Sequence, residues 1–332
     1  MVKNLLEMNF SELNDTLDSL LKKMELPGSV TYSGASIHYK KYNKIRLLIV
    51  AAYRLLAAEL FYRKHIQKKL GGLRKARFLK TFKPYFYIFR IGLPDLLQNL
   101  GGKFDDKIAA SYMMAAMLYD ASCDVPQYRT YLKEFNDLIM FDRPIVKDDE
   151  FLTLFKTSLN AIQSDIDKET FETFKDYIKI EHISQLMSLY QASDKPLTKD
   201  TLLKITLAKG GITIMAGMYL MAPTITKEER KAIYELGGVL QILEDIHDMS
   251  EDLENGIQTL SNQQMVSYDE MRRLYFGSVN NMISVCRVNP TCPNTTLDLF
   301  CWLVDKVLEE KYAPLFHTEQ QRKTTYEKPF TT

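Results

Sequence analysis

The stretch IAASYMMAAMLYDASCD (residues 108–124) contains the pattern that decides the fold. Its apolar residues recur at three- and four-residue intervals, which is the period of one face of an α-helix. The same period continues almost without pause from about residue 42 onward, and no alternation typical of β-strands accompanies it. Glycine (14 residues) and proline (11 residues) are scarce for a chain of 332, which favours long helices over many short strands. The sequence therefore predicts an all-α fold in a single domain.

Two parts of the chain differ in their patterning. Residues 1–41 are loosely patterned, and we expect them to form an N-terminal extension with one short amphipathic helix from Phe10 to Met24. Residues 42–332 are expected to form the helical bundle. The most apolar run near the N-terminus, Ile45 to Tyr62, contains charged residues and is too polar for a membrane span. We interpret it as a helix buried in the core, and no stable membrane insertion is expected.

The overall charge excludes some classes of partner. Lys and Arg number 43 and Asp and Glu 42, so the net charge is +1. A chain this balanced has no global electrostatic reason to bind nucleic acid, and none is expected as a partner. The four cysteines form no CxxC pair, and the first residues do not resemble a signal peptide. We therefore expect reduced thiols and a cytoplasmic location.

The first pair of informative acids is Asp120 and Asp124. They lie one helical turn apart, so their carboxylates point the same way. They follow a run rich in Ala, Met and Tyr that is expected to be buried. Two buried like charges are unfavourable unless a cation or a proton lies between them, and a hard divalent cation suits oxygen ligands. The alternative interpretation is a solvated helix end before Pro126.

A second acidic segment is QILEDIHDMSED (residues 241–252). At ~100° per residue, Asp245, Asp248 and Asp252 fall within a sector of roughly 60°, with Glu244 at its edge. An exposed acidic helix face is the alternative. Two acidic stripes on separate helices, however, can face each other across a bundle and hold several cations. Such a cluster would neutralise an anion as highly charged as a diphosphate.

These segments resemble known motifs. Residues 244–248, followed by Asp252 and Asn255-Gly256, resemble the second aspartate-rich motif of trans-prenyltransferases, with Glu244 in place of its first Asp. Residues 120–124 depart from the usual DDxxD and resemble the DxxCD form of the large terpene synthases, the group that includes tetraprenyl-β-curcumene synthase. Lys209 is similar in position to the diphosphate-contacting Lys of prenyl synthases. The chain, over residues ~45–315, therefore resembles the class I isoprenoid synthase superfamily.

The resemblance implies a class I isoprenoid synthase helical bundle with three Mg²⁺ ions. Two ions are implied at Asp120 and Asp124 and the third at Asp245, Asp248 and Asp252, with Glu244 as a further candidate ligand. Asp120, Asp124, Asp245 and Asp248 are the expected catalytic residues. The expected substrate-binding residues are Lys209, Gly211, Gln241, Tyr119, Ala116 and Tyr112. The alternatives are a surface lysine for Lys209 and plain core for the two tyrosines and the alanine.

The resemblance also implies a reaction. Chain-elongating synthases bind a second substrate with an early basic segment, which GGLRKAR (residues 71–77) resembles only loosely. This favours a terpene synthase, a carbon–oxygen lyase that ionises one long prenyl diphosphate and releases pyrophosphate. Arg54, Arg63 and Arg90 could also reach the site, but each is expected to be a surface charge or a partner for an acid.

Two alternatives stay open. One is a prenyltransferase that elongates or couples prenyl diphosphates. The other is a non-catalytic all-α metal-binding or scaffold protein. A homodimer and a transient membrane contact for a greasy product are also left open.

Overall fold

Helices make up nearly all of the computed structural model, which describes residues 5–29, 43–70, 73, 80, 82–147, 149–286 and 294–316. Within these ranges there is no β-strand, which confirms the all-α prediction. Short 3₁₀ and π-helical segments connect or extend the α-helices. The helices are α1 (Phe10–Lys23), α2 (Lys44–Phe61), α3 (Phe82–Asn99), α4 (Asp106–Asp124), α5 (Leu132–Phe141), α6 (Glu150–Asp165), α7 (Lys168–Ser188), α8 (Lys199–Met221), α9 (Lys227–His247), α10 (Met249–Glu254), α11 (Tyr268–Val285), α12 (Thr295–Val304) and α13 (Ala313–Phe316).

Side-chain caps fix the start of the helices that matter most for the site. The carboxylate of Asp105 accepts hydrogen bonds from the backbone N–H groups of Lys107 (2.8 Å) and Ile108 (3.0 Å) at the start of α4. Thr226 and Glu229 form a capping box at the start of α9. Each cap satisfies amide donors that have no partner inside the helix. These caps define where α4 and α9, which carry the two acidic segments, begin.

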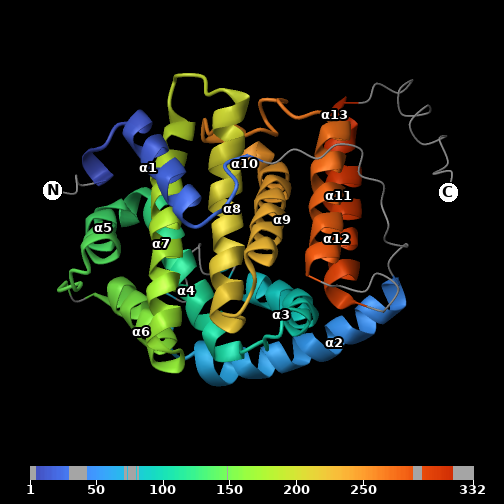
Figure 1. Ribbon diagram of the computed structural model, residues 1–332, viewed down its shortest axis with the longest axis horizontal. Coiled ribbons are helices and arrows are strands. Elements are labelled where there is room, and N and C mark those ends of the chain that lie inside the picture. The colour runs from blue at the N-terminus through green and yellow to red at the C-terminus, as the bar shows by residue number, and fades with distance from the viewer. Residues whose placement is uncertain are drawn as a thin grey trace.

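Helices α8 and α9 form the most extensive helix pair, and they stand side by side in the middle of the molecule with α7 next to α8 (Figure 1). Glycines allow the close approach. A Cβ added to Gly210 of α8 would lie 2.4 Å from Cβ of Gln241, and one added to Gly211 would lie 2.6 Å from the carbonyl oxygen of Tyr234. No side chain fits at these points. The glycines therefore hold the backbones of α8 and α9 close together.

The N-terminal helix was placed correctly, since α1 ends within one residue of the predicted Met24. Its buried residues Leu13, Leu17 and Leu21 join the main hydrophobic core, and α1 packs on α7. The predicted boundary between residues 41 and 42 lies outside the described residues.

The interpretation of Ile45 to Tyr62 as a helix buried in the core is wrong. Helix α2 packs one face on α3 and α12, where Leu47 contacts the apolar side chains of those helices, but its opposite face is open to solvent. The error has a physical reason, because an apolar run without a polar face contains no signal that distinguishes one-sided from complete burial. In the described part of the chain, no helix is long and apolar enough to cross a bilayer.

Candidate functional site

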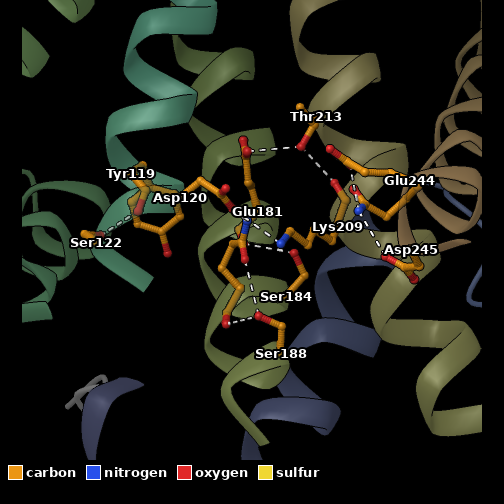
Figure 2. Close-up of polar contacts among 12 residues, drawn as sticks. Tyr119, Asp120, Ser122, Glu181, Ser184, Ser188, Lys209, Thr213, Glu244 and Asp245 are labelled. Atoms are coloured by element: carbon orange, nitrogen blue, oxygen red, sulfur yellow. Dashed lines mark hydrogen bonds and ion pairs between the residues drawn. The ribbon is translucent and has the colours of Figure 1, made fainter. Parts of the chain in front are cut away.

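The site is built around one lysine. Helix α4 contributes Asp120, α7 contributes Glu181, α8 contributes Lys209, and α9 contributes Glu244 and Asp245 (Figure 2). In Figure 2, Lys209 lies between Asp120 on one side and the two acids of α9 on the other. The two acidic segments predicted from the sequence, which are about 120 residues apart, are therefore brought to the same place.

The ammonium group of Lys209 takes part in the interaction that joins these helices. Its Nζ lies 3.4 Å from Oδ1 of Asp120, and 22% of its side-chain surface is exposed. Burial by itself would lower the pKa of this lysine, yet the nearby acids raise it well above its usual value. The acids that do so are Asp120, Asp124, Glu244 and Asp245. The charge of Lys209 is thus coupled to the acids of both segments.

The carboxylates at the end of α4 are held in place by neighbouring residues. The side-chain amide of Gln185 on α7 donates to Oδ1 of Asp120 at 2.7 Å. Asp124 lies at the last position of α4, where desolvation and then the charge of Asp120 raise its pKa to about 6. The positive charges of Lys209 and Arg129 lower this pKa, but by less than desolvation and Asp120 raise it. Negative charge is therefore in excess at this helix end.

The side chains of Gln241 and Tyr85 orient the acids of α9. The side-chain nitrogen of Gln241 donates to Oε2 of Glu244 (2.9 Å) and to Oδ1 of Asp245 (3.3 Å). The hydroxyl of Tyr85, on α3, donates to Oε1 of Glu244. Burial raises the pKa of Asp245 to about 7 and also raises that of Glu244. Gln241, expected to bind substrate, is thus seen to position two of the acids.

The second acidic segment extends past the end of α9 into α10. The sequence analysis treated residues 245–252 as one helix, whereas α9 ends at His247 and α10 begins at Met249, with Asp248 exposed between them. The backbone N–H of Asp252 still donates to the carbonyl oxygen of Asp248 at 2.9 Å, so the helical phase is kept across the break. Desolvation and then Asp248 raise the pKa of Asp252 to about 6. Asp248 and Asp252 therefore extend the same acidic segment.

The carboxylates of this cluster are oxygen ligands of the kind that could hold Mg²⁺. Among the residues that the structure describes, no three His, Cys, Asp or Glu side chains form a metal cage by themselves. Mg²⁺ does not require one, because it is usually bound through one or two carboxylates, with waters and phosphate oxygens as its other ligands. The pKa values of Asp124, Asp245 and Asp252 are raised first by desolvation and then by neighbouring acids. A hard cation would supply positive charge among them.

A cavity of about 350 Å³ lies beside this cluster, between α4 and helices α5 to α7. Three of the expected substrate-binding residues, Tyr112, Ala116 and Tyr119, line it. The hydroxyl of Tyr112 donates to the carbonyl oxygen of Thr213 (2.7 Å), and that of Tyr119 lies 2.6 Å from Nδ1 of His182. Because both hydroxyls have hydrogen-bond partners, the rings can line an apolar space without leaving a polar group unpaired.

Glu181 also lines the cavity, and the sequence analysis missed it. Its residue surface is only 4% exposed, its Oε1 accepts a hydrogen bond from the hydroxyl of Thr213 (3.1 Å), and burial raises its pKa to about 7. The signal was the run EHISQ (residues 181–185), five consecutive buried residues of which four are polar. Buried polar runs of this kind are unusual in a core and indicate a functional or structural network.

Arg129 is a second cation at the site that the sequence analysis did not single out. Its Nε donates to the carbonyl oxygen of Cys123 at 3.0 Å, and its charge lowers the pKa of Asp124. This places a guanidinium group at the end of α4, close to the first acidic pair. In the sequence, the one indication that Arg129 belongs to the site is that it lies five residues after Asp124, beyond Pro126.

Other predicted residues lie elsewhere. Substrate contact by Gly211 stays a prediction, since the structure shows it packed against Tyr234 of α9. Three arginines were expected to be surface charges or partners for acids, and each of them contacts a carboxylate. The pairs are Arg54–Asp95, Arg63–Glu59 and Arg90–Asp106. The segment 71–77 includes Leu73 as its one described residue.

The chain was compared with known families, curated proteins and solved structures. No family model and no curated protein matches it. Among solved structures it is similar to a geranyltransferase from Legionella pneumophila, with a TM-score of 0.50 and 13% sequence identity. The similarity covers 79% of this chain and 98% of that one. The chain therefore shares the all-α fold of that structure. This confirms the predicted fold class, while the finer resemblance to the large terpene synthases stays a prediction.

Proposed function

We propose that the chain is a Mg²⁺-dependent class I terpene synthase, which ionises one prenyl diphosphate and releases pyrophosphate. The observation that carries the proposal is the position of Lys209 between Asp120 and the acids of α9, beside a cavity lined by aromatic rings. A site with few cations among many acids suits a diphosphate that arrives together with divalent ions. The similarity in fold to a geranyltransferase supports chemistry on isoprenoid diphosphates.

Recognition of the diphosphate is assigned to the two cations at the site. Lys209 supplies an ammonium group, and Arg129 supplies a guanidinium group at the end of α4. Asp120 and Asp124 would hold Mg²⁺ on one side, and Asp245, Asp248 and Asp252 on the other, with Glu244 oriented by Tyr85 and Gln241. When bound, Mg²⁺ supplies Lewis-acid stabilisation of the leaving diphosphate.

Ionisation breaks the bond between the allylic carbon and the diphosphate oxygen, and the diphosphate leaves with the electron pair. The ammonium of Lys209 stabilises the charge that develops on that oxygen, because it is already in place and partly shielded from water. The hydrocarbon cation is left in the adjoining cavity, which Tyr112 and Tyr119 line and where aromatic rings would stabilise positive charge. Loss of a proton, after cyclisation or directly, gives a neutral alkene.

A prenyltransferase is the second candidate, and the similarity to a geranyltransferase favours it. It would transfer the same allylic cation to a second prenyl or isopentenyl diphosphate. That reaction needs a further set of cations for the second diphosphate, and Arg54, Arg63 and Arg90 are already paired with acids. This pairing is why we place the single-substrate reaction first.

One experiment separates these possibilities. The purified full chain is incubated with Mg²⁺ and geranyl, farnesyl or longer prenyl diphosphates, with and without isopentenyl diphosphate. Pyrophosphate is quantified and products are identified by mass spectrometry, with EDTA as the metal-free control. We expect pyrophosphate release from a single prenyl diphosphate. Turnover only with isopentenyl diphosphate would identify a transferase, and no turnover by folded protein would favour the non-catalytic scaffold.

A further inference from the structure

Helix α2 exposes an apolar face that the proposed reaction does not use. Six of the eleven large apolar side chains that are exposed in the described part of the chain lie on it, with exposed fractions from 61% at Leu56 to 75% at Tyr53. Solitary exposed apolar residues are normal, but a contiguous set on one helix is typical of an interaction surface. We call this set the α2 stripe: Ile45, Leu48, Ile49, Tyr53, Leu56 and Leu60.

The α2 stripe is a continuous band along one side of the helix. At ~100° per residue its members fall within a sector of roughly 140°, and at 1.5 Å per residue it is about 22 Å long. The opposite side packs inward through Leu47, together with Ala51 and Leu55, against residues of α3 and α12. In Figure 1, α2 runs along the lower edge of the molecule, across the ends of the upright helices. It therefore offers a long apolar surface at the boundary of the fold.

The inner face of α2 is firmly attached. Arg46 forms an ion pair with Asp298 of α12, and Arg54 forms one with Asp95 of α3. Nη1 of Arg54 also donates to the carbonyl oxygen of Ile91 at 2.6 Å. These contacts fix the rotation of α2 about its axis, so the outward direction of the α2 stripe is determined by specific pairing.

The charges around the α2 stripe are basic. Lys44 begins the helix, and the exposed residues Arg63, Lys64, Lys68 and Lys69 follow its end. Glu59 is the single acid of α2 and is already bound by Lys83, Tyr87 and Arg63, which hold its pKa at about 2. An apolar face bounded by lysines and arginines is the composition of helices that lie in the interface of an anionic membrane.

A second copy of this chain fits the same surface less well. A twofold dimer would place α2 of each copy antiparallel or parallel to the other. The antiparallel arrangement brings Lys44 near the basic end of the other helix, and the parallel one brings both basic ends together. Glu59, the acid of α2, is already bound by neighbouring side chains, so it does not neutralise the lysines of the other copy. Both arrangements therefore bring like charges together, whereas anionic lipid headgroups would attract them.

We infer that the α2 stripe docks this protein on the surface of an anionic lipid bilayer. The stripe residues would enter the boundary between headgroups and acyl chains, and the flanking lysines would contact the headgroups. The helix would lie in the plane of the surface. The inference stands on α2 alone and does not depend on the proposed reaction.

The test is co-sedimentation of the full chain with vesicles of phosphatidylcholine alone or of phosphatidylcholine with phosphatidylglycerol. We expect binding to the second kind, weakened by salt because exposed charges are screened. Leu56→Ser should lower the partition coefficient about tenfold, since it removes a large apolar side chain from the contact. The control is Val146→Ser, which removes a still more exposed apolar side chain (86%, against 61% for Leu56) outside the stripe. It should leave binding unchanged.

A variant with two lysines replaced tests the predicted contact with anionic headgroups. Lys64→Gln combined with Lys68→Gln should weaken binding to anionic vesicles at least about tenfold, as expected for two cations at a charged surface. The exposed Lys133→Gln on α5 is the control. Circular dichroism checks that each variant is folded. Equal loss of binding in Leu56→Ser and Val146→Ser, or no binding by the wild type, would overturn the inference. So would a wild-type dimer that Leu56→Ser converts to monomer, measured by analytical ultracentrifugation.

Discussion

Lys209 Nζ on α8 lies 3.4 Å from Oδ1 of Asp120 on α4, and the same ammonium is in the field of Glu244 and Asp245 on α9. One lysine thus provides positive charge for both acidic segments. Desolvation raises the pKa values of Asp124 and Asp245 by more than the charge of Lys209 lowers them. This arrangement also makes the stability of the metal-free protein sensitive to that one charge.

Lys209→Met is expected to lower the free energy of unfolding of the metal-free protein by roughly 1–3 kcal/mol, because the clustered acids lose their shared cation. Mg²⁺ should restore part of this loss by supplying charge in its place. The measurement is urea unfolding at neutral pH with EDTA or with Mg²⁺. Lys133→Met, an exposed lysine of α5, is the control. Equal stability of Lys209→Met and wild type in EDTA would contradict the prediction.

Asp120→Asn is expected to reduce pyrophosphate release at least about a hundredfold, the size typical of losing a preorganised electrostatic contact. The fold should persist, because the amide can still accept the hydrogen bond from Gln185. Steady-state kinetics and circular dichroism measure the two effects. Asp194→Asn, an exposed aspartate in a loop, should behave as wild type. If Asp120→Asn kept near-normal turnover, Asp120 would not be part of the catalytic site.

Glu181 should make stability depend on pH. Its pKa is raised from 4.5 to about 7 in the folded protein, so the folded state keeps a proton that the unfolded state releases. The contribution of Glu181 to the free energy of unfolding therefore falls as the pH rises from about 4.5 to about 7. Above pH 7 it does not fall further. Glu181→Gln should be more stable than wild type at pH 8, by about 1–3 kcal/mol.

Chemical unfolding at a series of pH values checks this prediction. The difference between Glu181→Gln and wild type should disappear at the acid end of the series, where both side chains are neutral. Glu169→Gln, an exposed residue of the same helix, is the control and should show little change at any pH. A Glu181→Gln variant that is less stable than wild type at pH 8 would mean that the carboxylate is stabilised by contacts beyond Thr213.

Gly210→Ala is expected to destabilise the fold by about 1–3 kcal/mol, since the added Cβ would lie 2.4 Å from Cβ of Gln241 and force α8 and α9 apart. Because Gln241 also holds Glu244 and Asp245, turnover should fall together with stability. Thermal unfolding and pyrophosphate release give both readings. Gly28→Ala, whose nearest neighbouring atom would be 3.9 Å away, should be neutral. Unchanged stability in Gly210→Ala would show that the helix pair is not tightly packed.

Part of the site could be predicted from the sequence because it depends on local spacing. Asp120 and Asp124 are one turn apart on any α-helix, and the acids from Glu244 to Asp252 keep a helical phase even across the break at Asp248. The helical fold follows from a period that every turn repeats. Glu181, Arg129 and Tyr85 could not be placed in this way, because what makes them part of the site is the packing of α7, the turn after α4, and α3 against the acids.

By itself, the sequence determined that the chain is helical and that two separate segments, residues 120–124 and 244–252, carry acids at helical spacing. Only the tertiary structure decided that these acids converge on Lys209, and that an apolar cavity lies beside them. It also decided which side of α2 faces inward, since both sides are apolar and only the packing of α3 and α12 distinguishes Leu47 from Leu48. The physical reason is that periodicity specifies directions around one helix axis, whereas convergence and exposure depend on which other helices occupy those directions.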